Sequence, residues 1–219
     1  MNQESMYGSQ LSTLEVNKLI KNTYILLAMT LAFSAVCAGI GMALGVGRMG
    51  SLLLSLGGLV LLFVTLRKAD TSAGLFWVFA FTGMEGASLG YILNHYVGME
   101  NGPQLIMQAL GLTAVVFVTL SMYALSTKKD FSFMGGFLMA GLVVMIVGGI
   151  ASFFIQSTPF FMALNAGIAL LMSALILYDT SRIVNGGETN YIRATVSLYL
   201  DFLNLFISLL NLLGLSNDD

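Results

Sequence analysis

Seven long apolar runs restrict the folds open to this chain more than any other feature of its sequence. We expect one membrane span in each of the ranges 24–46, 50–67, 73–96, 103–126, 132–156, 159–184 and 192–215. A helix needs about 20 predominantly apolar residues to cross the roughly 30 Å hydrocarbon core of a bilayer. Backbone groups in lipid must be paired within their own segment. The sequence therefore predicts an all-α membrane protein, a bundle of seven transmembrane helices.

The composition is that of a chain whose solvent is lipid. Hydrophobic residues make up 57% of the chain, charged residues only 9%, and the mean hydropathy is +0.88. Ordinary soluble domains are about one quarter charged. The formal net charge of −2 and the lack of a basic patch interleaved with aromatic residues argue against nucleic acid as a partner. The single cysteine, Cys37, allows no disulfide framework.

We divide the chain into three parts. Residues 1–23 are assigned to a cytoplasmic N-terminal segment, 24–215 to the seven-helix transmembrane domain and 216–219 to a short tail. The polar start lacks an apolar run followed by a small-residue cleavage site, so we do not expect a cleavable signal peptide. Ser12 followed by Glu15 fits a capping box, which predicts a short helix ahead of the first span.

The basic residues predict the orientation. With seven crossings, one side of the membrane holds Lys18, Lys21, Arg67, Lys68, Lys128, Lys129, Arg182 and Arg193, and only Arg48 lies on the other side. Cytoplasmic loops carry the excess of Lys and Arg, so we expect a cytoplasmic N-terminus. The tail "SNDD" has no basic residue. A re-entrant last helix with a cytoplasmic C-terminus therefore stays open as an alternative.

Small residues spaced four apart let helix backbones approach closely in a membrane. Three such pairs occur: Gly41 and Gly45, Gly86 and Gly90, and Gly136 and Ala140. We expect these pairs to pack helices within the bundle rather than to form a dimer face.

Three acidic residues lie inside the predicted spans: Glu85 in the third, Asp179 in the sixth and Asp201 in the seventh. A charged Asp at the centre of a transmembrane helix costs about 2.5–3.5 kcal/mol on insertion scales, and such residues usually mark an ion or proton path. The alternative is that the acids pair with arginines or hydroxyls and only fix helix packing. For the two aspartates we favour a functional role, and for Glu85 both interpretations stay open.

Asp179 and Asp201 are predicted to meet. Their spans are antiparallel neighbours, and the two residues lie at similar depths when counted from the middle of the connecting loop. On the seventh span, polar residues recur at intervals of four, three, four and three, which makes one helical stripe: Ser197, Asp201, Asn204, Ser208 and Asn211. A polar stripe on an apolar helix is expected to face a partner or a water-filled cavity.

Two carboxyl groups held close together cannot both ionise at low cost, so we expect this pair to share a proton. Such a pair would sense pH, and when deprotonated it would attract a cation such as Ca²⁺, which prefers oxygen ligands. Arg182, one turn beyond Asp179, and Arg67, at the end of the second span, are the candidate counter-charges. We expect no firmly held metal and no cofactor beyond transient Ca²⁺.

An enzyme is not expected. The sequence has no serine, histidine and acid cluster of a hydrolase and no glycine-rich phosphate loop after a strand. Intramembrane aspartyl proteases also use two membrane aspartates, but neither "LYDT" nor "YLDF" carries the Gly-x-Gly-Asp motif of those enzymes.

The segment "LYDTSRIVNGGETNYIRATVSLYLDFLNLFISLLNLLG" carries a specific family likeness. Three weaker motifs, "KNTYILLAMTLAFSA", "FAFTG" and "KKDFSFMGGFLMAG", extend it over nearly the whole chain. In these motifs the chain resembles the Bax inhibitor-1 family. The resemblance implies a seven-helix bundle in which the last helix is central.

The resemblance also implies two functions. In calcium-leak members, an aspartate pair on the last two helices acts as a pH-sensitive latch together with an arginine at the end of the second helix, and Asp179, Asp201 and Arg67 match these positions. Resemblance to another bacterial branch of the family implies binding to the membrane ATP-dependent protease FtsH. Our first expectation is therefore a multi-pass protein of the bacterial inner membrane that modulates FtsH. The alternative is a pH-sensitive calcium or cation leak gated by the aspartate pair.

Overall fold

The computed structural model describes residues 13–217, and all regular structure in this part of the chain is helical. The elements are α1 (Thr13–Ala43), α2 (Arg48–Lys68), α3 (Gly74–Ser88), α4 (Gly90–Val97), α5 (Gly102–Thr127), the 3-10 helix η2 (Ser132–Met134), α6 (Gly135–Ser152), α7 (Thr158–Val184) and α8 (Tyr191–Asn217). Together they provide seven spans that are long and apolar enough to cross a membrane. The predicted all-α, seven-span fold is confirmed.

The first span and the segment before it form one helix. α1 begins at Thr13, so the short helix predicted ahead of the first span is continuous with that span. The predicted cap at Ser12 lies outside the described residues. A single helix of 31 residues is longer than a bilayer core requires, and its first turns can therefore extend beyond the hydrocarbon region.

The third predicted span is interrupted at Leu89, between α3 and α4. The N–H of Leu89 donates to the carbonyl of Gly86 at 3.0 Å, one residue short of the α-helical partner. The next residue, Gly90, lies so close to the backbone of Gly41 in α1 that a Cβ atom would collide with it. Glycine and serine positions are common sites of helix kinks. Here the interruption allows α4 to pack against α1.

The small-residue pairs differ in their roles. Gly41 and Gly86 each lie against the backbone of a neighbouring helix, where a Cβ atom would not fit. The expectation that these glycines pack helices within the bundle is therefore confirmed. It is wrong for Gly45, which lies after the end of α1 and where a Cβ atom would meet nothing within 4 Å. It is also wrong for Gly136 and Ala140, because both are exposed and a Cβ atom at Gly136 would meet nothing within 4 Å. That pair faces away from α7, whose side chains lie instead against Gly141 and Gly148 of α6.

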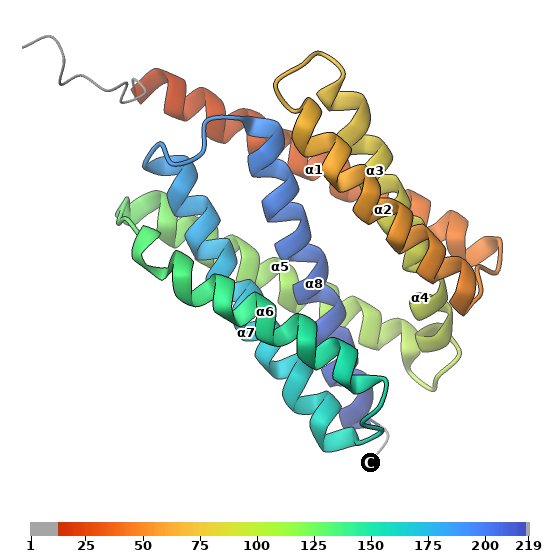
Figure 1. Ribbon diagram of the computed structural model, residues 1–219. Helices are drawn as coiled ribbons and strands as arrows, with labels where there is room; N and C mark the ends of the chain where they lie inside the picture. The colour runs from red at the N-terminus through yellow and green to blue at the C-terminus, as the bar shows by residue number, and fades with distance from the viewer. Residues whose placement is uncertain (1–12, 218–219) are drawn as a thin grey trace, which may run out of the picture.

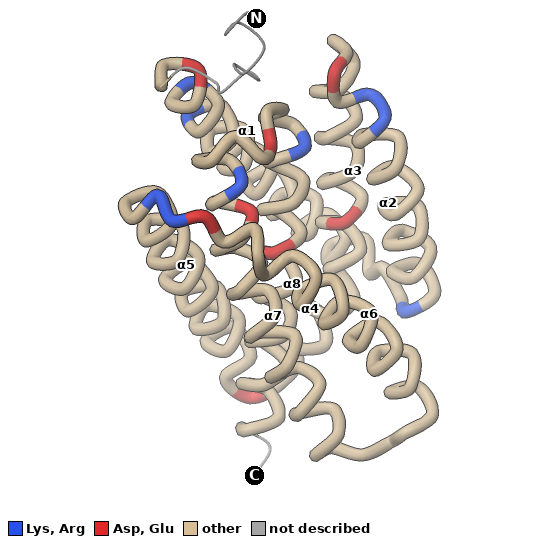
Figure 2. The backbone as a smooth tube through the Cα atoms, turned by 60° about the vertical axis from the view of Figure 1, so that its left-hand side comes forward, with Lys and Arg blue, Asp and Glu red and all other residues tan. Residues whose placement is uncertain are grey.

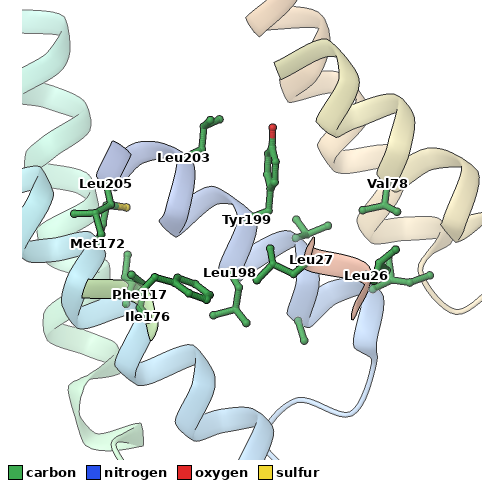
Figure 3. Close-up of a cluster of buried hydrophobic side chains, with 14 of the residues drawn as sticks. Leu26, Leu27, Val78, Phe117, Met172, Ile176, Leu198, Tyr199, Leu203 and Leu205 are labelled. Carbon is green, nitrogen blue, oxygen red and sulfur yellow. The ribbon is translucent and has the colours of Figure 1, made fainter. Parts of the chain in front are cut away.

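α8 runs through the middle of the bundle, with α1 to α3 on one side and α5 to α7 on the other (Figure 1). It is the most buried of the seven spans, whereas α2 and α6 are the least buried. Figure 3 shows side chains of α8, including Leu198 and Leu205, among residues of α5 and α7 such as Phe117 and Ile176. Lipid tails are as apolar as leucine, so close packing rather than exclusion of water holds these helices together. The expectation of a central last helix is confirmed.

Basic residues gather at one end of the bundle. Figure 2 shows Lys and Arg mainly at the end where α1 begins, with acidic residues both there and in the middle of the bundle. Arg48 begins α2 and so lies at the opposite end. This distribution places the charged ends of the helices near the two membrane surfaces and leaves acids within the apolar region.

Candidate functional site

The structure brings Asp179 and Asp201 together between α7 and α8. The two helices run antiparallel as close neighbours, joined by a connection over residues 185–190. The two side chains interact directly as a carboxyl–carboxyl pair. Because two adjacent carboxylates repel each other, such a contact needs a shared proton or a bound cation.

Asp201 is enclosed. Its residue is 4% exposed, and its Oδ2 atom is buried without a hydrogen-bond partner in the described part of the chain. A buried carboxylate without a partner is costly in a medium of low polarity. The geometry therefore requires a neutral Asp201 or a cation beside it whenever the helices adopt this arrangement.

Asp179 contacts a cation on its other side. Its Oδ1 lies 3.6 Å from Nη1 of Arg182, one turn further along α7, and the two side chains are 13% and 33% exposed. Arg182 is fixed by two more contacts, a hydrogen bond of 3.1 Å to the carbonyl of Gly187 and a position 5.7 Å above the ring of Tyr178. The pair is thus asymmetric, because among the described residues Asp179 has a positive neighbour and Asp201 has none.

Arg67 is exposed in the last turn of α2 and makes no ion pair in the described structure. The structure does not bring it to the aspartates. A different ion pair, Arg193 with Asp70, joins the start of α8 to the loop after α2. Asn190 strengthens this link by donating to the carbonyl of Ala69 at 3.0 Å and to Asp70 at 2.8 Å.

The link at Asn190 also starts α8. The side-chain oxygen of Asn190 accepts hydrogen bonds from the N–H groups of Ile192 and Arg193 at 2.8 and 3.2 Å, which is the geometry of an N-cap. An asparagine directly before an apolar run is a sequence signal for such a cap. The partner Asp70 carries no comparable signal, because its role depends on tertiary contact.

Glu85 lies apart from the aspartate pair. It is half-buried in α3, and its carboxyl group covers the backbone of Gly58 in α2, where only a glycine leaves room. Among the described residues, its side chain forms no hydrogen bond or ion pair. The glycine of α2 therefore accommodates the acid sterically without neutralising it.

The polar stripe of α8 ends in a hydrogen-bonded network near the other membrane surface. Asn211 donates to the side chain of Asn165 in α7 at 2.9 Å and accepts from the hydroxyl of Tyr96 in α4 at 3.0 Å. Between this network and the aspartates, Ser208 is also buried. The sequence analysis missed Asn165, although a lone asparagine in an apolar run is itself a signal.

The described residues contain no cluster of three or more His, Cys, Asp or Glu side chains that could hold a metal ion. Asp179 and Asp201 offer two carboxyl groups, whereas Ca²⁺ takes six to eight oxygen ligands. A calcium ion at this pair would therefore take most of its ligands from backbone carbonyls or water.

Comparison with known proteins shows to which family the chain belongs. A family model described as "Inhibitor of apoptosis-promoting Bax1" matches residues 16–218. The chain belongs to the Bax inhibitor-1 family. Its similarity to other family members covers nearly its whole length, so the seven spans and the aspartate pair lie within the matched region.

Three relatives show the extent of this similarity. An "Uncharacterized membrane protein" of Vibrio cholerae is 51% identical over 208 residues, 94% of this chain and 93% of the relative. The "Modulator of FtsH protease YccA" of Escherichia coli is 46% identical over 208 residues, 95% of this chain and 94% of the relative. An uncharacterized protein of Pseudomonas aeruginosa is 43% identical over 205 residues, 94% of this chain and 92% of the relative. The names of the family and of its members describe inhibitors, modulators and membrane proteins rather than enzymes.

Proposed function

We propose that this protein binds the ATP-dependent membrane protease FtsH and modulates its activity in the bacterial inner membrane. The observation that carries the proposal is the 46% identity with the Escherichia coli protein named as a modulator of FtsH, over 95% of this chain. A second Escherichia coli relative with the same identity is named as an inner membrane protein. Because the similarity covers every span rather than one motif, it supports a shared role of the whole bundle.

The charge distribution supports contact from the cytoplasmic side. Basic residues gather at the end where α1 begins, and from the positive-inside rule we expect that end to face the cytoplasm. The N-terminal sequence "MNQESMYGSQ" is polar and precedes α1. A protease that consumes ATP works where ATP is present, which is the cytoplasmic side, so contact is expected there.

Affinity capture tests the proposed binding. The tagged full-length protein, purified from native membranes in mild detergent, should retain FtsH, whereas an unrelated seven-span protein expressed at the same level should not. Overexpression should also change the half-lives of membrane proteins that FtsH degrades. No recovery of the protease together with unchanged half-lives would rule out the proposal.

A second candidate function is a pH-sensitive calcium leak through the bundle. The observation that favours it is the enclosed carboxyl group of Asp201, which interacts with Asp179 and whose Oδ2 is buried without a hydrogen-bond partner in the described part of the chain. With one shared proton, the pair carries about one negative charge and is held by Arg182. Loss of that proton adds repulsion between the acids and favours separation of α7 and α8. Gain of a second proton removes the attraction to Arg182 and also loosens the contact.

Calcium flux into liposomes tests the second candidate. The purified protein, reconstituted with a calcium indicator enclosed, should give a flux that varies across a pH series. A tenfold change in the open population needs only about 1.4 kcal/mol, so modest coupling to one proton suffices. Flux no greater than that of protein-free liposomes at every pH would exclude a leak.

A further inference from the structure

A groove opens between the first turns of α1 and the last turns of α5 and α7. Its volume is about 400 Å³. One wall is apolar and is formed by Val16, Ile20, Leu125 and Val184, and its polar rim includes Asn17 and Lys128. It therefore combines an apolar surface with a charged edge at the end of the bundle where the basic residues gather.

The groove is closed towards the centre of the membrane. One helical turn deeper, the same three helices meet through hydroxyl groups: Tyr24 of α1 and Thr180 of α7 share a hydrogen bond of 3.3 Å, and Ser121 of α5 lies 3.5 Å from Thr180. The ring of Tyr24 also packs edge-on against Phe117 of α5. These contacts lie between the groove and the depth of the aspartate pair, so the groove is not expected to be an entrance to a path.

The charge beside the groove is mainly positive. Lys128 lines the groove, and three more lysines directly follow lining residues in the sequence. All four are exposed, and no ion pair in the described structure involves them: Lys18, Lys21, Lys128 and Lys129. Two acids are near, Glu15 on α1 and Asp130 after α5. Hydrogen bonds from the hydroxyl and the N–H of Ser132 occupy Asp130 and hold the pKa of that carboxyl below its usual range. Asp130 therefore stays ionised, and the four lysine charges still outnumber the two acidic charges.

We propose that this groove binds an anionic phospholipid, with the phosphate against Lys128 and an acyl chain along the apolar wall. Basic pockets between transmembrane helices at the cytoplasmic surface suit anionic headgroups, and the apolar wall suits the chain attached to such a headgroup. A free phosphate ion would contact only the rim. This site goes beyond the proposed function and does not depend on protease binding.

Lipid retention by the purified full-length protein tests the site. Native mass spectrometry from mixed micelles should show phosphatidylglycerol retained in preference to phosphatidylcholine, and added inorganic phosphate should not displace it. Lys128→Gln should weaken phosphatidylglycerol binding about fivefold, the effect of one lysine charge near an anionic surface. Asn17→Trp should fill the groove and reduce retention of the lipid without changing a charge.

Lys68→Gln is the matched control, because Lys68 is exposed at the same end of the bundle in the last turn of α2 and does not line the groove. It should bind phosphatidylglycerol as the wild type does. Lys128 and Asn17 are also exposed, so all three variants should keep the fold, and an unchanged melting temperature will verify this. The proposal would be overturned if the protein retained the two lipids equally or if phosphate displaced phosphatidylglycerol. It would also be overturned if Lys68→Gln weakened phosphatidylglycerol binding as much as Lys128→Gln does, or if both groove variants bound this lipid as the wild type does.

Discussion

Asp201 of α8 lies against Asp179 of α7, and one carboxyl oxygen of Asp201 is buried without a hydrogen-bond donor in the described structure. On the other side of Asp179, Arg182 lies at 3.6 Å. A proton between the two carboxyl groups would supply the missing donor. We propose that the strength of the contact between the last two helices depends on protonation of this pair.

Asn at either acidic position should flatten the pH dependence of calcium flux. Asp201→Asn supplies an amide N–H that can donate to Asp179 at every pH, so the contact no longer depends on a proton. Asp179→Asn should have the same effect, and the double variant should add little because the two acids act as one unit. Flux across a pH series in liposomes is the measurement.

Glu85→Gln is the control for this experiment, since Glu85 is also an acid within the membrane but does not contact the pair. Its pH profile should match that of the wild type. If both aspartate variants kept the wild-type profile, Asp201 would serve helix packing alone.

The hydroxyl of Tyr199 should contribute to stability. It donates to the carbonyl of Thr82 at 3.2 Å and shares a hydrogen bond of 2.8 Å with Ser34, which ties α8 to α3 and α1. Tyr199→Phe leaves these buried partners unsatisfied and should cost about 1–3 kcal/mol. Tyr91→Phe is the control, because Tyr91 is 41% exposed. Thermal unfolding in detergent should show a lower melting temperature only for Tyr199→Phe.

Two glycines should respond in opposite ways to alanine. Gly90→Ala would push a methyl group into the backbone of Gly41 and should destabilise the bundle by about 1–3 kcal/mol, as overpacking does. Gly111→Ala places its methyl group in open space on α5 and should be neutral or stabilise by up to about 1 kcal/mol through helix propensity. The melting temperatures of the two variants are measured side by side with that of the wild type. A Gly90→Ala variant as stable as the wild type would refute the packing account.

Cysteine labelling should establish the orientation. Cysteines introduced at Ser126, near the end of α5, and at Gly98, between α4 and α5, lie at opposite ends of one span. An impermeant reagent should label the first only from the cytoplasm and the second only from the other side. The Cys37→Ser background removes the native thiol. Labelling of both from one face would contradict the seven-span topology.

Sequence predicted those features that depend on local pattern. The spans follow from apolar length, and the meeting of Asp179 and Asp201 follows from equal depth on two antiparallel neighbours. The interruption at Leu89 could not be predicted in this way, because it depends on how closely α1 approaches Gly90. Spacing alone likewise could not show that Gly136 faces away from α7.

Charge partners were harder to predict than helices. Arg182 lies on the same helix as Asp179, so helical spacing was enough to suggest their contact. Arg67 lies on another helix, and its distance from the pair depends on how α2 packs, which no local pattern encodes. The link between Asp70 and Arg193 was missed for the same reason, since it joins the loop after α2 to the start of α8, far apart in the sequence.

Reconstitution of FtsH tests the central claim most directly. Purified FtsH, ATP and a membrane protein substrate are combined in proteoliposomes, with and without this protein, and the rate of substrate degradation is measured. We predict that degradation slows as the protein is added, because the protein occupies the protease. The Asp201→Asn variant should slow degradation as much as the wild type does, because the role proposed for the aspartate pair is separate from protease binding. A degradation rate that stays constant as the protein is added, up to a large excess over the protease, would contradict the account.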